Sequence, residues 1–221
     1  MTRTKLAQRV LPSYTKGEEI FNMTSHIVGG ALSIVALVLC IIFAALRHNT
    51  YGVIASAIYG SCMIAVYVLS SVYHGLKPSM GKKVMQVIDH CGIYFMIAGS
   101  YMPVVLCSIR VQSTALCWII FGIEWALVAF ATTLTAIDLK KYKVLSMVCY
   151  IGMGWLIILF VKPLYLSIGF NGVALFVLGG ILYTIGAVIY SLKRIYAHSI
   201  FHIFIVLGSI AHFFAIILYV L

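Results

Sequence analysis

Residues 25–46 read SHIVGGALSIVALVLCIIFAAL, a run without Asp, Glu, Lys or Arg that ends against Arg47. About 20 mostly apolar residues in a helix cross roughly 30 Å of hydrocarbon, so this run is long enough to span a membrane. It is also too long for the apolar core of a removable signal peptide, and no small-residue cleavage site accompanies it. We therefore expect it to stay in the mature protein as its first membrane helix.

The composition of the chain extends this interpretation to its whole length. Of the 221 residues, 63% are hydrophobic and 9% are charged, with a mean hydropathy of +1.11. Ordinary soluble domains have about 45–50% apolar and about 25% charged residues. Only helices and closed barrels are stable in a bilayer, and runs of this length indicate helices. We predict an all-α membrane protein, a bundle of seven transmembrane helices. The predicted spans are Ser25–Leu46, Tyr51–Tyr73, Val87–Ser108, Ser113–Thr133, Val144–Val161, Asn171–Leu192 and His198–Tyr219.

The connections between these spans are short and contain no repeat or low-complexity tract. Residues 25–221 are therefore expected to form a single transmembrane domain, preceded by a cytoplasmic N-terminal segment, residues 1–24. Six cysteines lie within the spans or at their edges, without CxxC spacing, and are predicted to be small core residues rather than disulfides.

The net charge of +10 is unevenly distributed over the connections. One side of the predicted bundle has twelve basic residues: Arg3, Lys5, Arg9, Lys16, Lys77, Lys82, Lys83, Lys140, Lys141, Lys143, Lys193 and Arg194. The other side has three, Arg47, Arg110 and Lys162. The positive-inside rule then predicts a cytoplasmic amino terminus and, after seven crossings, an external carboxyl terminus. This alternation argues against nucleic acid as a partner, and the basic stretch from Arg3 to Lys16 is suited to contacts with anionic lipid headgroups.

Ionisable residues at membrane depth are costly, so they indicate function. On this topology His26, His74, Asp89, His198 and His202 all fall in the cytoplasmic leaflet. His198 and His202 are four residues apart and therefore point the same way from one helix. A third imidazole, from His74, would complete a His₃ site, which leaves zinc one open position. The simpler alternative is that these histidines bond to headgroups or backbone carbonyls near the interface.

Two further residues suit hydrolytic chemistry at such a site. Ser70 precedes His74 by one helical turn and could orient its imidazole as a supporting hydrogen-bond partner. Asp89 could accept a proton from water activated by the metal. Amide or ester hydrolysis is the reaction that these groups favour. Imidazole ligands also suit copper, nickel and iron, so zinc is a preference rather than a necessity.

The motifs resemble those of the hemolysin III family. They are Ser70-Ser-Val-Tyr-His74, the segment from Asp89 to Pro103, His198-Ser-Ile-Phe-His202 and the opening segment from Glu19 to His26. That family is grouped with the progestin and adiponectin receptors and, more distantly, with the alkaline ceramidases. The resemblance covers nearly the whole chain.

This resemblance implies a site and an activity. It implies zinc held by His74, His198 and His202, with Asp89 contacting the metal-bound water and Ser70 behind His74. It also implies a zinc-dependent, ceramidase-like hydrolase of a lipid amide in the bacterial plasma membrane. The family name implies instead a pore-forming or cytolytic protein, and a membrane-lipid sensor or receptor with a structural zinc is the third alternative.

Two deeper residues keep the channel alternative open. Glu124 is predicted to lie in the middle of its span, and His212 lies about 15 Å beyond His202 by helical rise. We interpret Glu124 as a protonated or hydrogen-bonded interior group and His212 as a packed, bonded interior histidine. His90, beside Asp89, is interpreted as a hydrogen-bonding residue at a helix interface. His26, with Asn22 and Glu19, fits equally a gate or supporting role at the metal site and a cap of the first helix.

Overall fold

The computed structural model describes residues 4–192 and 194–221, so Arg3 and Lys193 lie outside the described residues. Within these ranges all regular structure is helical. The principal helices are α1 (Lys16–Leu46), α2 (Thr50–Gly75), α3 (Met80–Pro103), α5 (Thr114–Asp138), α6 (Lys143–Trp155), α7 (Val161–Ser191) and α8 (Ala197–Ala215). Shorter pieces are η1 (Leu6–Gln8), η2 (Val104–Ile109), α4 (Arg110–Gln112), η3 (Leu156–Phe160) and η4 (Ile216–Val220). The all-helical prediction is confirmed for the described part of the chain.

Local sequence signals set where the helices begin. α1 starts ahead of the predicted span because Thr15 and Glu18 form a capping box, each side chain bonding to the other's backbone N–H. Side chains of Asn49, Ser79 and Ser113 cap α2, α3 and α5 in the same general way. These caps place a helix start directly after the connections that precede α2, α3 and α5.

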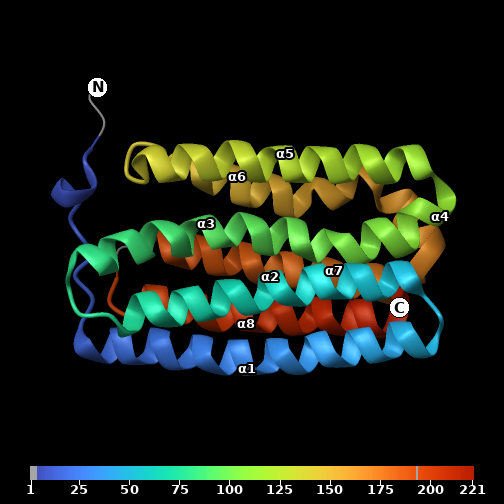
Figure 1. Cartoon of the computed structure of the whole chain (residues 1–221), viewed down its shortest axis with the longest axis horizontal. Coiled ribbons are helices and arrows are strands. Elements are labelled where there is room, and N and C mark those ends of the chain that lie inside the picture. Colours follow the sequence, from blue (N-terminus) through green and yellow to red (C-terminus); the bar gives the residue numbers. More distant parts are fainter. Residues whose placement is uncertain (1–3, 193) are drawn as a thin grey trace.

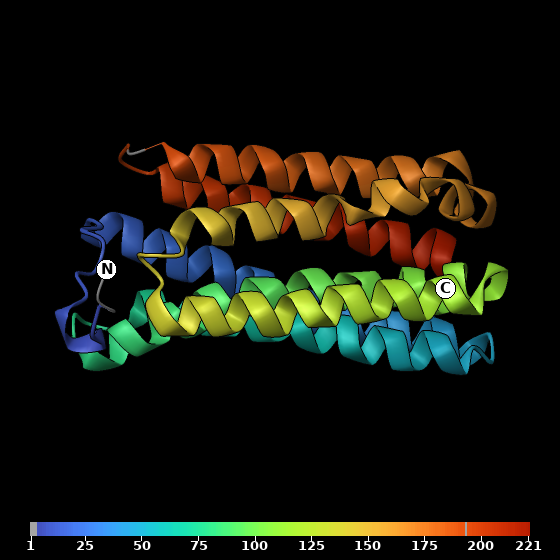
Figure 2. The same ribbon diagram turned by 90° about the horizontal axis from the view of Figure 1, so that it is seen from above.

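Among the described residues, six helical segments are long and apolar enough to cross a membrane. The longest, Lys143–Ser191, has 49 residues and covers two of the seven predicted spans except for Leu192. As one straight helix it would be about 74 Å long, more than twice the hydrocarbon thickness. The chain instead breaks at Gly169, whose φ of 69° is a conformation that only glycine adopts readily. Both views show the ribbon turning back in this region, between α6 and the long arm of α7 (Figures 1 and 2).

The helices lie side by side along one axis, with α3 in the middle of the bundle (Figure 1). α3 and its continuation to Gln112 form the most deeply buried span. Pro103 does not stop this helix, because the π-helical turns of η2 follow and absorb the break in hydrogen bonding.

Gly29 lets α1 approach α2 closely, since a side chain there would meet the ring of Tyr67. All six cysteines are free, as predicted.

The two ends of the bundle differ in their connections. The N-terminal segment and the α2–α3, α5–α6 and α7–α8 connections gather at one end, and the α1–α2 connection and α4 lie at the other (Figure 1). The N-terminal segment is fastened across its end of the bundle: the Thr4 N–H donates to Asp138 Oδ2 at 2.8 Å, and Arg9 Nη2 donates to the carbonyl of Ile137 at 3.1 Å. Residues well before α1 therefore pack on the same end as the beginning of α8.

Candidate metal centre

The beginning of α8 is held against the beginning of α1. Tyr196 precedes α8 in the left-handed conformation, with φ of 63°, and its N–H donates to Glu18 Oε1 at 2.8 Å. This contact directs the first two turns of α8, with His198 and His202, toward the last turn of α2, which contains His74. The topology thus joins residues that are more than 120 positions apart in sequence.

The three imidazoles converge through their Nε2 atoms. Nε2 of His198 lies 3.2 Å from Nε2 of His74 and 3.0 Å from Nε2 of His202. One ligand atom from each of the three residues lies within 4.8 Å of the other two. Tetrahedral zinc with Zn–N bonds of about 2.0–2.1 Å needs nitrogens roughly 3.3 Å apart. The spacing therefore fits a single ion bound by all three nitrogens. Hydrogen bonding alone does not explain it, because His198 Nε2 has only one hydrogen or one lone pair in its ring plane and cannot bond to both neighbouring nitrogens.

Contacts at the opposite ring nitrogens set two of the tautomers. His74 Nδ1 lies 2.7 Å from Glu19 Oε2, and because a carboxylate only accepts, Nδ1 must donate. His202 Nδ1 lies 3.5 Å from Ser25 Oγ, whose own proton goes to the carbonyl of Asn22. In both rings the lone pair is therefore on Nε2, the atom that faces the other two histidines. This is the orientation that metal-binding histidines adopt when a hydrogen bond fixes Nδ1.

Two aromatic rings enclose the triad. Tyr14 stacks on His198 with centroids 5.0 Å apart and an interplanar angle of 21°. His26 stacks on His202 at 3.7 Å and 15°, and it is buried at 5% exposure. Burial raises the pKa of Tyr14 well above its ordinary value, so its phenol stays neutral over the triad. The three histidines are thus covered on the side of the N-terminal segment.

Asp89 and Ser70 lie beside the triad on α3 and α2. Both are buried, and both line the cavity that His198 and His202 line. The Ser70 hydroxyl and the His74 imidazole both lie near enough to the Asp89 carboxylate to interact with it. The role predicted for Ser70 behind His74, and that of Asp89 toward water, stay predictions.

His90 Nδ1 donates to the carbonyl of Gln86 within α3 at 2.8 Å, so this ring is already bonded on its own helix.

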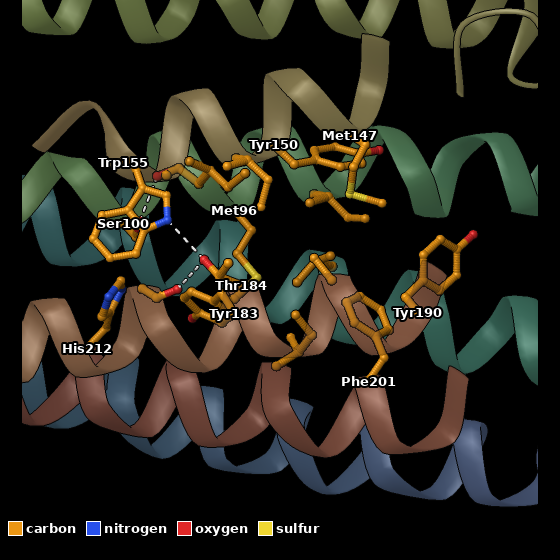
Figure 3. A pocket seen from close by; sticks show the side chains of 18 of the residues that line it. Met96, Ser100, Met147, Tyr150, Trp155, Tyr183, Thr184, Tyr190, Phe201 and His212 are labelled. Atoms are coloured by element: carbon orange, nitrogen blue, oxygen red, sulfur yellow. Dashed lines mark hydrogen bonds between the residues drawn. The ribbon is translucent and has the colours of Figure 1, made fainter. Parts of the chain in front are cut away.

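A cavity of about 160 Å³ runs from the triad into the bundle among α2, α3, α6, α7 and α8. Figure 3 shows Tyr190 and Phe201 toward one end, and Trp155 and His212 at the other. Its lining is mainly apolar, and within it Trp155 Nε1 donates to Thr184 Oγ1 at 2.9 Å. The cavity is thus an apolar pocket with His198 and His202 in its lining.

Glu124 and His212 do not share one environment. His212 lines the cavity, and its Nε2 donates to the carbonyl of Phe176 at 3.2 Å, as expected of a bonded interior histidine. Glu124 is fully buried on α5 and is not among the cavity's described lining residues. Neither of its carboxyl oxygens has a hydrogen-bond partner among the described residues, which leaves the protonated form of the two predicted alternatives.

Sequence reasoning missed part of the site. Tyr14 was not singled out, and Lys82 entered only as a basic charge. Glu19 was included with His26 and Asn22 as a gate or supporting group at the metal site or as part of a cap of the first helix, without its partner. A signal for Glu19 existed: Glu19, Asn22 and His26 are three and four residues apart and so share one face of α1. That face is the one that meets His74 and His202.

Together, the apolar helices and the buried histidine triad define a multi-pass helical membrane protein with a candidate metal centre near one end. Residues 14–213 match the family model described as "Haemolysin-III related", and the chain belongs to this family. It is 37% identical over 207 residues to the "Hemolysin-3 homolog" of Bacillus subtilis (strain 168), covering 93% of this chain and 96% of that protein.

Other relatives come from bacteria and from mammals. The chain is 36% identical to "Hemolysin-3" of Bacillus cereus, over 92% of each chain. It is 29% identical to the human "Monocyte to macrophage differentiation factor", over 81% of this chain and 78% of that protein. No solved structure matches the chain significantly. The apolar helices and the bacterial relatives identify a multi-pass integral protein of the bacterial plasma membrane.

Proposed function

We propose that this chain is a zinc-dependent hydrolase that cleaves an amide bond of a membrane lipid of ceramide type. The observation that carries the proposal is the convergence of three Nε2 atoms at the end of an apolar cavity that also contains Asp89. Three imidazole ligands leave tetrahedral zinc one open position, as in catalytic rather than structural sites. His74, His198 and His202 would hold the ion.

The residues around the triad have distinct roles in this proposal. Zinc, when bound, supplies a Lewis acid that polarises a carbonyl and lowers the pKa of water. Asp89 takes the proton of the attacking water and returns it to the leaving nitrogen. One water is thereby added across the C–N bond, which yields a carboxylic acid and an amine. Ser70, which lies beside the Asp89 carboxylate, would donate to it and hold it in place for this exchange.

The cavity favours a lipid as substrate. It is lined mainly by apolar side chains and reaches from the histidines to His212, about 15 Å along α8. An acyl chain placed there would have its carbonyl at the triad. Apolar pockets with a few convergent polar groups are the usual form of small-molecule sites. A lipid already dissolved in the bilayer could reach such a pocket laterally.

We also propose seven crossings, with a cytoplasmic amino terminus and an external carboxyl terminus. The break at Gly169 supports counting the two arms of Lys143–Ser191 as separate crossings. The basic residues support the orientation, because the connections at the triad's end contain most of them. The triad would then face the cytoplasm, where the basic end meets anionic headgroups.

Metal analysis of the purified full-length protein in detergent tests the first part of the proposal. We expect one zinc per chain in the wild type and loss of that zinc in His198→Ala/His202→Ala. His212→Ala is the matched control, because it removes an imidazole from the same helix outside the triad, and it should retain the metal. Equal zinc in the double variant and the wild type would refute the site.

A lipid assay tests the second part. The wild type in mixed micelles should release fatty acid from ceramide, and Asp89→Asn should retain zinc while losing about 10²–10⁴-fold in rate, the usual contribution of a general base. Zinc binding without cleavage of any ceramide-like lipid would overturn the hydrolase proposal in favour of a sensor with a structural zinc. A metal-independent conductance in planar bilayers would instead indicate a channel.

A further inference from the structure

Glu19 uses its two carboxylate oxygens for two different buried partners. Oε2 accepts from His74 Nδ1 at 2.7 Å, and Oε1 accepts from Lys82 Nζ at 2.6 Å. The exposed fraction of the side chain is 21% for Glu19, 0% for His74 and 4% for Lys82. This contact is therefore mostly withdrawn from solvent, unlike the ion pairs of a protein surface, which contribute little.

Hydrogen bonds to backbone carbonyls hold the Lys82 ammonium in place, in addition to its ion pair with Glu19. Lys82 sits in the first turn of α3, and its ammonium also donates to the carbonyl of Leu76 at 2.9 Å and approaches that of His74 at 3.5 Å. These carbonyls belong to the end of α2, where a helix leaves its last acceptors unpaired. A buried ammonium is costly unless it is paired and bonded, and here all three of its donors have an acceptor.

The three histidines differ in how firmly Nδ1 is held. His74 has a carboxylate at 2.7 Å, whereas His202 has the Ser25 hydroxyl at 3.5 Å. Nδ1 of His198 has no partner among the described residues. Hydrogen bonds to an ionised acceptor are shorter and roughly twice as strong as neutral ones. His74 is therefore the imidazole whose orientation the protein fixes most strongly, although it comes from a different helix than the other two.

We propose that Glu19 and Lys82 form a positioning pair for the metal centre. Glu19 acts through His74, holding the proton on Nδ1 and the lone pair of Nε2 toward the ion. Lys82 acts through Glu19, holding the carboxylate in place by joining it to the end of α2. This inference rests on the zinc site of the proposed function, and it adds a role for two residues outside the triad.

The test is zinc affinity, measured by competition with a fluorescent chelator on the full-length protein in detergent. Glu19→Ala should bind zinc about 10–100-fold more weakly, the usual loss when a partner of a ligating histidine is removed. Glu19→Gln keeps a carbonyl acceptor and should recover part of that loss. Lys82→Ala should weaken binding less than Glu19→Ala does. The double variant should be no weaker than Glu19→Ala alone, because the pair acts along one path.

A neighbouring lysine provides a matched control. Lys83→Ala changes the same residue type one position from Lys82, where the ammonium contacts the carbonyl of Ala7 rather than the triad. It should bind zinc like the wild type. Cobalt substituted for zinc gives a second readout, because its visible absorption reports ligand geometry; the spectrum should change in Glu19→Ala and return toward the wild-type form in Glu19→Gln.

The outcomes separate this inference from the proposed function. Wild-type affinity and an unchanged cobalt spectrum in folded Glu19→Ala would overturn the positioning pair while leaving the zinc site intact. If Glu19→Ala does not fold, wild-type affinity and spectrum in both Glu19→Gln and Lys82→Ala would overturn it equally. A wild type that binds no zinc would refute the proposed function itself, and the inference with it.

Discussion

His198 and His202 lie in the first turns of α8, and His212 lies in its last turns. The imidazoles of the two regions have different surroundings. At the first turns three Nε2 atoms face one another, and carboxylate or hydroxyl groups lie behind two of the rings. At the last turns one imidazole donates to a backbone carbonyl and packs against Phe176 and Tyr183. A buried histidine therefore indicates a metal site through the convergence of several rings, whereas burial alone is satisfied by one hydrogen bond.

The largest effect that would test this difference is stabilisation by zinc. A ligand that binds only the folded state at about 1,000 times its Kd adds roughly 4 kcal/mol to the free energy of unfolding. We expect zinc to raise the thermal unfolding temperature of the wild type and of His212→Ala in detergent. The temperature for His198→Ala/His202→Ala should not respond to zinc or to a chelator. A response of equal size in that variant would place the stabilising ion elsewhere.

A smaller effect is expected from disturbing the His212 region alone. A Cβ added to Gly179 would run into the imidazole of His212 and lie 3.2 Å from the carbonyl of Gly208. Gly179→Ala should therefore destabilise the packing of α7 on α8 by about 1–3 kcal/mol, the usual cost of overfilling a packed interface. Zinc affinity should be unchanged, because the triad lies about 15 Å away along α8. Weakened zinc binding in this variant would mean that the two regions are coupled.

The sequence predicted the members of the triad because their chemistry and spacing are local: His198 and His202 are one helical turn apart, and each membrane span is a long apolar run. It could not predict the contact of Glu19 with His74 and Lys82, which are 55 and 63 residues away and meet it only through the register of three helices. Lys82 falls in the connection between two predicted spans, where a basic residue usually faces water. The seven-span expectation and the six apolar segments differ at Gly169, where a positive φ interrupts an otherwise helical stretch.

Tyr14 covers the triad and should slow the release of zinc, an effect of intermediate size. The ring stacks on His198 from the N-terminal segment, and aromatic pairs contribute about 0.5–1.5 kcal/mol beyond their buried area. Tyr14→Ala should release zinc to a chelator roughly 2–10-fold faster, whereas Tyr14→Phe should match the wild type because the stacking survives. Identical release from all three proteins would show that the metal leaves by another route.

The smallest effect is expected at Glu124, the other ionisable group deep in the bundle. Its carboxyl oxygens have no partner among the described residues, so the amide of Glu124→Gln loses no hydrogen bond there. An ionised carboxylate at membrane depth is costly, which favours the neutral acid as the form that the amide replaces. We expect the free energy of unfolding to change by less than about 1 kcal/mol, with zinc affinity unaltered. A loss well above this would mean that Glu124 binds a partner such as a buried water or cation, and a changed bilayer conductance would connect that partner to ion passage. If neither the stability nor the conductance changes, Glu124 is buried without a function of its own. The convergence of several ionisable side chains, as at the triad, would then be what distinguishes a functional group from a merely buried one.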